Sequence, residues 1–297
     1  MKPNRKIDFF IVGAAKAGTT SLYHYLRQHE DIYLPRSKDF FVFNDDPTYG
    51  VPESKMGVYY RKYGGERLVG GSNVMIMRFA SAVRNLHHYN PDARLIVMLR
   101  NPVDRAYSNY WMMRRTGQER CDTFEAALAE GPVRAKRGLF RELAQLLYVE
   151  PGYYYEQLRS IYGFFDRDRV YIGLFDDLKA DPKQVTCQVL DHLGANSSNL
   201  QIDFSKKLNQ ASIAKYKLLQ GVITNQNKLK RILRRVTPFT LRILINEALL
   251  KKVVGWNQSF VEYPPMAPET RAQLVEQFLP HNERLSVLIG RDLGHWR

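Results

Sequence analysis

Two short segments of the sequence combine residue types that bind phosphate groups. The first, Gly13-Ala14-Ala15-Lys16-Ala17-Gly18-Thr19-Thr20, has two glycines five positions apart, as in the loops of nucleotide-binding proteins. Backbone N–H groups of such a loop, with the positive end of a following helix, can cradle an anion. The alternative is a small-residue turn that only packs a helix on a strand. The phosphate-binding interpretation has these candidate residues: Lys16, Ala17, Gly18, Thr19, Thr20 and Ser21.

This loop differs from the loop of magnesium-dependent nucleotide hydrolases. Thr19 stands where their lysine lies, and the lysine is inside the loop as Lys16. Those enzymes also hold the metal with an acidic residue at a strand end, whereas the apolar run 95–99 is followed by Arg100. A magnesium ATPase is therefore disfavoured. A P-loop nucleotide or nucleoside kinase stays as the alternative hypothesis because of the glycine spacing.

Arg100 and Ser108 form a second candidate anion site. Ser108 follows Arg100 by eight residues, about two helical turns, so the two fall near the same face. An arginine at a strand end and a serine on the next helix can hold one dianion through charge-assisted hydrogen bonds. The alternative for Arg100 is a surface ion pair with Asp104.

Apolar runs that must position these residues alternate with segments of helical period. Three runs lack polar alternation, as expected of central parallel strands buried on both faces: 9–12, 95–99 and 170–174. This pattern predicts an α/β fold, a P-loop-like three-layer architecture with a central parallel sheet flanked by helices.

Helix signals follow each of these strands. One helix includes residues 21–26, a second is predicted over 102–115 with Asn101 as its cap, and a third begins at Asp181-Pro182 and ends at Gly194. Residues 268–278 and 280–289 are further helical segments. We expect one domain over residues 1–297.

The charge of the chain is concentrated in one segment. The 297 residues are 44% hydrophobic and carry 44 Lys and Arg against 30 Asp and Glu, a net charge of +14. Residues 201–255 hold twelve basic residues against Asp203 and Glu247, a net charge of +10. Apolar residues at near-helical spacing over 218–233 predict a basic amphipathic helix there. Such a helix can steer an anionic ligand or contact a membrane surface peripherally, so a non-catalytic binder of polyanions or membranes is a third hypothesis; we expect no nucleic-acid partner.

Cysteine usage and the amino-terminal residues bear on location. Cys121 and Cys187 lack metal-ligand spacing, and they favour neither a disulfide framework nor a zinc site. The apolar run 9–15 is closed by Lys16, and no stretch approaches the ~20 apolar residues of a membrane helix. We expect no signal peptide and a cytoplasmic protein, with the inner membrane surface as the alternative location.

Together, the two phosphate motifs resemble those of the PAPS-dependent sulfotransferases, which carry sulfate from 3′-phosphoadenosine 5′-phosphosulfate (PAPS) to an acceptor. FIVGAAKAGTTS (10–21) is similar to the family's 5′-phosphosulfate loop, and RNPVDRAYS (100–108) looks like its 3′-phosphate motif, including the spacing from Arg to Ser. Weaker similarities lie at KDFFVF (38–43), at FDDL (175–178) and over 282–293. The resemblance is best to the bacterial and heparan-type branch.

The resemblance implies roles for particular residues. Lys16 and the rest of its loop would hold the 5′ side of PAPS, and Lys16 would also stabilise charge on the leaving oxygen. Arg100 and Ser108 would bind the 3′-phosphate, and Lys215 is the best match to a basic residue of a loop that closes over the nucleotide. No metal is required, and the acceptor would be a small molecule, a glycan or a lipid with a hydroxyl or amine.

The general base and the acceptor are the points where the sequence departs from the family. Asp39 occupies the position of a glutamate in the family's Lys-Glu-x-x-Phe-Phe motif and is the expected base, one methylene shorter; His87 and His88 are the rivals. In the segment 70–75 that follows, Ser72 alone matches the relatives' pattern, so a heparan-like acceptor is not implied. Tyr153-Tyr154-Tyr155 would line an acceptor cleft or pack in the core.

Overall fold

The computed structural model describes residues 5–38, 42–44, 53–198, 200–205, 212–214, 258–260 and 263–296. Contacts divide the chain into two compact units, the first formed by Met1–Ala106, Val149–Leu208 and Arg271–Arg297, the second by Tyr107–Tyr148 and Asn209–Thr270. The expectation of one domain stays a prediction.

The first unit is built on a parallel sheet of five strands in the order β2-β3-β1-β4-β5. The strands span Phe9–Gly13 (β1), Ile32–Tyr33 (β2), Leu68–Ser72 (β3), Arg94–Leu99 (β4) and Val170–Leu174 (β5). The three strands predicted from apolar runs are confirmed as β1, β4 and β5. β1 and β4 are buried on both faces, which explains their lack of polar alternation. β5 lies at one edge of the sheet, and its Tyr171 and Ile172 are half-buried.

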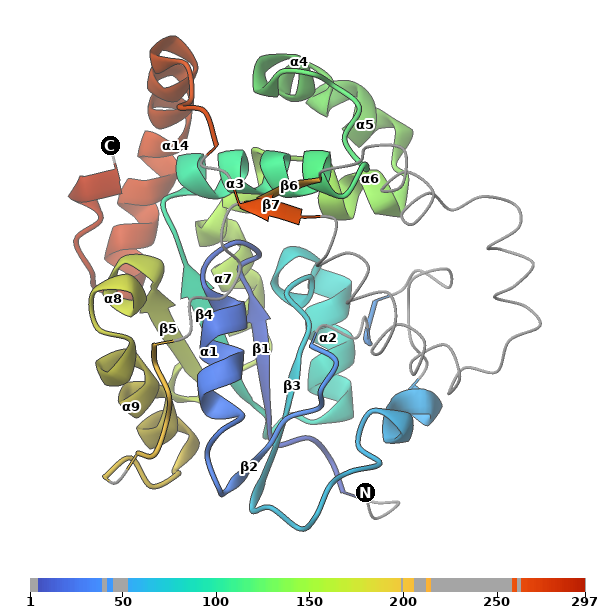
Figure 1. The fold of residues 1–297 in the computed structure, drawn as a ribbon, viewed down its shortest axis with the longest axis vertical. Coiled ribbons are helices and arrows are strands. Elements are labelled where there is room, and N and C mark those ends of the chain that lie inside the picture. Colours follow the sequence, from blue (N-terminus) through green and yellow to red (C-terminus); the bar gives the residue numbers. More distant parts are fainter. Residues whose placement is uncertain are drawn as a thin grey trace. The chain divides into compact units, whose positions relative to one another are not determined.

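Helices lie on both faces of this sheet, which confirms the predicted α/β architecture. In Figure 1, α1 lies in front of the sheet and α7 behind it. The helices of this unit are α1 (Thr19–Leu26), α2 (Ala80–Tyr89), the beginning of α3 (Pro102–Arg115), α7 (Tyr154–Tyr162), α8 (Phe175–Ala180), α9 (Pro182–Leu193) and α14 (Pro268–Ile289, from Arg271 on). Short 3-10 turns span η1 (Glu53–Val58), η2 (Ile76–Arg78), η3 (Glu150–Gly152), η4 (Arg167–Arg169) and η6 (Gly294–Trp296).

The helix ends follow the predicted signals. The side chain of Asn101 accepts a hydrogen bond from the backbone N–H of Val103 at 2.9 Å, and Asp181 accepts one from Gln184 at 2.9 Å. Gly194 ends α9 in the left-handed conformation, with φ 69°. The two predicted helical segments near residue 280 form one helix, α14, with Pro280 inside it.

Strand β3 was not predicted, and its glycines explain why. Gly70 and Gly71 pair with Phe9 and Phe10 of β1. A Cβ atom at Gly70 would lie 2.2 Å from Cζ of Phe9, and one at Gly71 would lie 2.6 Å from Cε1 of Phe10. The glycines thus leave the space that the two aromatic rings fill, and they remove the apolar pattern by which a strand is recognised.

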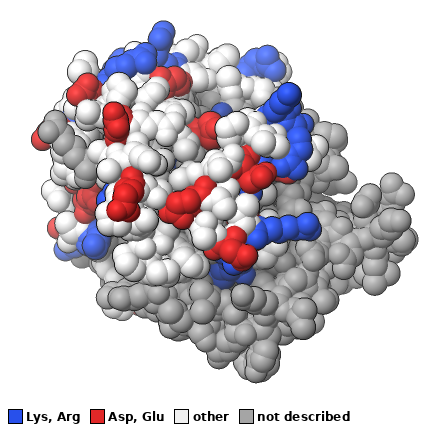
Figure 2. Space-filling view, turned by 90° about the horizontal axis from the view of Figure 1, so that it is seen from above, with Lys and Arg blue, Asp and Glu red and all other residues white. Residues whose placement is uncertain are grey.

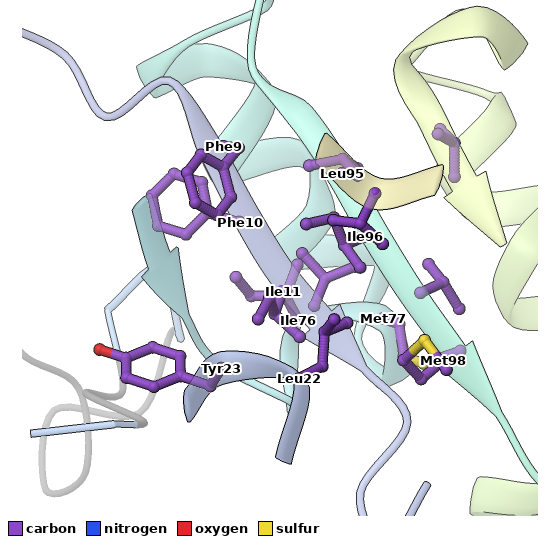
Figure 3. Packing of buried hydrophobic residues seen from close by; sticks show 14 of the residues in the cluster. Phe9, Phe10, Ile11, Leu22, Tyr23, Ile76, Met77, Leu95, Ile96 and Met98 are labelled. Carbon is purple, nitrogen blue, oxygen red and sulfur yellow. The ribbon is translucent and has the colours of Figure 1, made fainter. Parts of the chain in front are cut away.

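The core of the first unit packs both faces of β1 and β4 against helices. Figure 3 shows Phe9, Phe10 and Ile11 of β1 among side chains from the neighbouring elements. The other labelled members of this cluster are Leu22, Tyr23, Ile76, Met77, Leu95, Ile96 and Met98. This packing fixes the carboxyl ends of β1 and β4, where both phosphate motifs begin.

The second unit contains the rest of α3, α4 (Phe124–Ala129), α5 (Gly131–Arg137), α6 (Phe140–Gln145) and the antiparallel pair β6 (Ser212–Ala214) and β7 (Gln258–Phe260). A buried ion pair in this unit joins Glu119 to Arg134 of α5, with N···O distances of 2.7 and 2.9 Å. Tyr148 donates a further hydrogen bond to Glu119 at 2.7 Å, and the backbone N–H groups of Arg120 and Cys121 donate two more.

Charge on the surface is mixed. On the face shown in Figure 2, basic and acidic side chains of the described residues both occur, so this face carries no field of a single sign. None of the described helices combines the length and the apolar character needed to cross a bilayer. The predicted basic amphipathic helix over 218–233 lies outside the described residues.

We predict that Glu119→Gln destabilises the protein by about 3–5 kcal/mol, because it leaves the Arg134 guanidinium buried without its counter-charge. Urea denaturation at neutral pH measures this loss. Burial alone would raise the pKa of Glu119, but hydrogen bonds from Arg134, from the Cys121 backbone and from Tyr148 together hold it below the ordinary 4.5.

The same pKa sets the pH dependence of this contribution. The folded-state pKa lies below the unfolded one, so the ionised Glu119 stabilises the protein fully above pH 4.5 and less as pH falls through the folded pKa. The difference between wild type and Glu119→Gln should shrink over that acidic range. A difference that is constant with pH would contradict the assignment.

Candidate functional site

The two phosphate motifs meet at the carboxyl edge of the sheet. β1 and β4 are parallel neighbours, with Gly13 opposite Val97. The first motif leaves β1 at Gly13 and the second leaves β4 at Arg100. In parallel sheets this edge is where ligands bind, because the loops that follow neighbouring strands gather there. The guanidinium of Arg100 in fact contacts the first motif directly: Nη1 donates a hydrogen bond to the carbonyl of Lys16 at 3.2 Å.

The loop between β1 and α1 has two residues in the left-handed conformation. Lys16 has φ 72° and Gly18 has φ 80°. This conformation is uncommon for a residue other than glycine, and it occurs where surrounding contacts hold it, often at binding sites. The hydrogen bond from Arg100 to the Lys16 carbonyl is one such contact.

Helix α1 begins in a way that suits an anion. Gly18 is its N-cap and offers no side-chain acceptor, and the first turn contains no acidic residue. Ser21 and Leu22 donate their backbone N–H groups to the Gly18 carbonyl at 3.0 and 3.2 Å. The positive end of α1 is therefore not neutralised by a carboxylate of its own first turn.

Gly18 is packed closely by helix α8. A Cβ atom at this position would lie 2.7 Å from Cδ2 of Leu178 and 2.9 Å from Cδ2 of Phe175. Glycine is required at this position for two reasons, because φ is positive and because α8 leaves no space for a side chain. Helix α8 thus determines where the turn of the loop lies.

Arg100 is half-buried, and its guanidinium contacts uncharged groups. Its guanidinium lies over the ring of Phe175, 4.7 Å from the ring centroid, and among the described residues it forms no ion pair. Burial lowers the pKa of Arg100 from the usual 12.5, while the negative charges of Asp104 and Asp176 oppose this. The alternative of an Arg100–Asp104 surface pair is wrong, because the Asp104 carboxylate pairs with Arg271 at 2.6 Å.

Lys38 also reaches the loop. Its ammonium donates a hydrogen bond to Oγ1 of Thr19 at 3.3 Å, and Thr19 is buried. A little further along the chain, the buried side chain of Asn73 donates to the carbonyl of Val42 at 2.7 Å. Asp39, the expected base, lies outside the described residues. The residues on either side of it therefore contact the first motif and the end of β3.

The remaining predicted residues are distributed as follows. Ser108 is half-buried on α3, in the part of that helix that belongs to the second unit. Lys215 lies outside the described residues. His87 and His88 lie in the last turn of α2, where the His87 ring packs against Phe165 at 5.2 Å.

Tyr154, one of the three consecutive tyrosines, belongs to the core. It is 1% exposed, and its hydroxyl donates to the Arg100 carbonyl at 2.9 Å. Burial raises the pKa of Tyr154 to about 12, so the phenol stays a neutral donor at physiological pH. Tyr154, Phe175 and Asn73 position the site, and sequence reasoning assigned none of them this role. Their contacts join residues distant in sequence, which local patterns do not reveal.

Comparison with known proteins identifies the family. The model of the sulfotransferase domain matches residues 6–234. The crystal structure of a sulfotransferase from Alicyclobacillus acidocaldarius is similar, with a TM-score of 0.72, 27% identity and coverage of 99% of each chain. The resemblance seen in the motifs is confirmed: the chain belongs to the sulfotransferase family, enzymes that transfer sulfuryl groups.

Curated relatives match over shorter parts of their own length. Heparan sulfate glucosamine 3-O-sulfotransferase 6 of Homo sapiens is 33% identical over 105 residues, which cover 34% of this chain and 28% of that protein. Bifunctional heparan sulfate N-deacetylase/N-sulfotransferase 1 of Xenopus laevis is 24% identical over 302 residues, covering 96% of this chain and 30% of that protein. The chain thus spans less than a third of the length of these relatives.

We predict that Gly18→Ala lowers the free energy of unfolding by about 2–4 kcal/mol, since it adds overpacking to the strain of a positive φ. Urea denaturation measures the loss. Gly194→Ala is the matched control, because Gly194 has φ +69° and a Cβ there would meet no atom within 4 Å. The control should lose only about 1 kcal/mol. Equal losses in the two variants would show that α8 does not constrain the loop.

Proposed function

We propose that this domain transfers a sulfuryl group from PAPS to a hydroxyl or amine of a carbohydrate, lipid or natural-product acceptor. The observation that carries the proposal is the contact between the two motifs, in which the Arg100 guanidinium lies 3.2 Å from the Lys16 carbonyl. PAPS has an anionic group at each end of one adenosine, and the two motifs offer a cation each at neighbouring strand ends.

The state of Arg100 supports a dianionic ligand at this position. Among the described residues no carboxylate pairs with this half-buried guanidinium, and a bound phosphate would supply both the missing charge and hydrogen-bond acceptors. The 3′-phosphate is the group that distinguishes PAPS from ATP and ADP. We therefore assign the 3′-phosphate to Arg100, with Ser108 as a second ligand.

The first motif suits the other end of the nucleotide. The uncapped start of α1 and the residues 16–21 would bind the 5′-phosphosulfate, with Lys16 beside the oxygen that leaves. In the reaction, the acceptor oxygen or nitrogen attacks sulfur in line, and the bond from sulfur to the 5′-phosphate oxygen breaks. The products are the sulfated acceptor and 3′-phosphoadenosine 5′-phosphate. Cationic side chains can stabilise the leaving phosphate without a metal ion.

Asp39 is our proposed general base, which takes the proton from the acceptor. Support comes from its neighbours, because Lys38 hydrogen-bonds to Thr19 of the loop and Val42 hydrogen-bonds to Asn73 at the end of β3. Lys38 and Val42, which come before and after Asp39 in the sequence, therefore both contact residues at the edge of the sheet where the phosphate motifs lie.

The acceptor is proposed at the level of chemical class. Two relatives have heparan sulfate in their names, which favours a carbohydrate, but the segment 70–75 lacks most of the pattern of such relatives. Transfer of radiolabelled sulfate from PAPS to sugars, phenols and lipids tests the three classes. A cytoplasmic location, Lys215 over the nucleotide and peripheral membrane contact through 201–255 stay part of the proposal.

The first test is the thermal shift produced by nucleotides. We expect 3′-phosphoadenosine 5′-phosphate to raise the melting temperature in the absence of magnesium, and ADP to raise it much less, because stabilisation grows with the ratio of ligand concentration to Kd. A preference for ADP that requires magnesium would overturn the proposal and favour a P-loop nucleotide or nucleoside kinase.

Two variants test the two ends of the site separately, one by its affinity for the nucleotide and one by its rate of sulfate transfer. Arg100→Ala should weaken the binding of 3′-phosphoadenosine 5′-phosphate by about 10- to 100-fold, which corresponds to the loss of one or two hydrogen bonds to a charged group. Lys16→Ala should lower sulfate transfer by about 10²- to 10³-fold, in proportion to the lost stabilisation of the leaving group. If neither variant changes binding or transfer, the assignment of the motifs is wrong.

We predict that Asp39→Asn lowers the turnover number by about 10²- to 10⁴-fold, because the amide cannot accept the proton. Titration with 3′-phosphoadenosine 5′-phosphate should give a Kd near that of wild type. Asp39→Glu is the matched control and should keep substantial activity, since it restores the carboxylate of the family motif. Unchanged turnover in Asp39→Asn would remove this residue from the mechanism.

A further inference from the structure

Phe175 is the side chain of helix α8 that contacts both phosphate motifs. Its ring lies under the Arg100 guanidinium at 4.7 Å, and the edge of the same ring closes the space above Gly18. Phe175 is half-buried, and it is the first residue of α8, directly after β5. The ring therefore lies between the end of β4 and the turn that begins α1.

A chain of contacts supports Phe175 and Arg100 from the side of the core. Tyr154 holds the Arg100 carbonyl at 2.9 Å, and the Tyr154 ring packs edge-on against Trp296, with the centroids 6.3 Å apart. The indole of Trp296 donates to the carboxylate of Asp176 at 3.1 Å. Asp176 is the residue next to Phe175, so the contacts lead from one side of Arg100 back to the other.

We propose that Phe175 is a positioning residue that holds the Arg100 guanidinium in the plane in which it binds the 3′-phosphate. This inference rests on the proposed function and adds a residue to it. The phosphate motifs themselves do not contain Phe175. One face of the guanidinium lies on the ring and Nη1 is fixed by the Lys16 carbonyl, so both the tilt and the rotation of the group are set. The donors on the other edges of the guanidinium keep their direction toward the ligand.

The attraction between the cation and the ring is strong enough to matter. A cation over an aromatic face is stabilised more when it is desolvated, and Arg100 is half-buried. Without the ring, the long arginine side chain regains rotamers that point away from the ligand, and their entropy opposes binding. Leu178 still packs on Gly18 when the ring is removed, so the effect should be larger for the 3′-phosphate than for the 5′ end of the nucleotide.

Calorimetric titration with two nucleotides tests this inference. 3′-phosphoadenosine 5′-phosphate and AMP differ by the 3′-phosphate, which is the group assigned to Arg100. Phe175→Leu keeps the apolar bulk and removes the aromatic face. We expect it to weaken the binding of 3′-phosphoadenosine 5′-phosphate by about 2- to 30-fold. The affinity for AMP should change much less, because Leu178 still packs on Gly18, and Phe175→Tyr should restore the affinity for 3′-phosphoadenosine 5′-phosphate.

Two controls distinguish positioning from a structural effect. Tyr162→Leu removes a ring whose centroid lies 4.7 Å from the Arg167 guanidinium, away from the motifs. This variant should bind 3′-phosphoadenosine 5′-phosphate and AMP with the Kd values of wild type. In an Arg100→Ala background, Phe175→Leu should cause no further loss, because the group that it positions is absent. Melting curves of all variants check that they are folded.

The outcomes separate this inference from the proposed function. An unchanged Kd in Phe175→Leu, an equal loss for both nucleotides, or the same loss in the Arg100→Ala background would overturn the role of Phe175 alone. If wild type binds the two nucleotides equally, or if Arg100→Ala keeps the preference, the proposed function fails and the inference fails with it.

Discussion

The candidate site depends on the half-buried guanidinium of Arg100, whose contacts among the described residues are groups without charge. Arg100 contacts a backbone carbonyl and an aromatic ring, while the nearby carboxylate of Asp104 is occupied by Arg271. Placing a cation in this way costs free energy, which a bound anion can recover. The arrangement keeps the positive charge available, because a carboxylate in direct contact would compete with the ligand. The packing around Arg100 must therefore supply rigidity without placing a carboxylate in direct contact with the guanidinium.

The central strands supply that rigidity through a match between aromatic and glycine residues. Phe9 and Phe10 of β1 lie beside Gly70 and Gly71 of β3, so large rings fill space that the neighbouring strand leaves open. The first residues of β1 are packed against β3 in this way, within a well-packed core. A loop that includes Lys16 in a left-handed conformation can then be held by the hydrogen bond from Arg100 and by the packing of α8 on Gly18.

The sequence predicted the elements whose signals are local. The strands at 9–12 and 95–99 are apolar because they are buried on both faces, and the run at 170–174 has the same apolar pattern at the sheet edge. Asn101, Asp181 and Gly194 mark helix ends by their own hydrogen bonds or φ values. Strand β3 was not predicted, because its glycines leave space for the aromatic rings of β1 and give the segment no apolar pattern. The Arg100–Asp104 pair was a reasonable local alternative. It is not formed, and Asp104 instead pairs with Arg271, which is distant in sequence. The positions of Phe175 and Asn73 depend on the fold and have no local signal.

The cations at this edge of the sheet differ in chemistry, and the difference suggests a division of roles. Arg100 is planar, has fixed donors and is held on two sides, as suits recognition of a phosphate with defined geometry. Lys16 and Lys38 have compact charges on flexible stems, as suits a position where charge moves during a reaction. Rigid recognition at one motif and adaptable charge at the other would let affinity for the nucleotide and stabilisation of the leaving group vary independently. A lysine in place of Arg100 would lose the stacked plane, and an arginine in place of Lys16 would crowd a loop built from alanine and glycine.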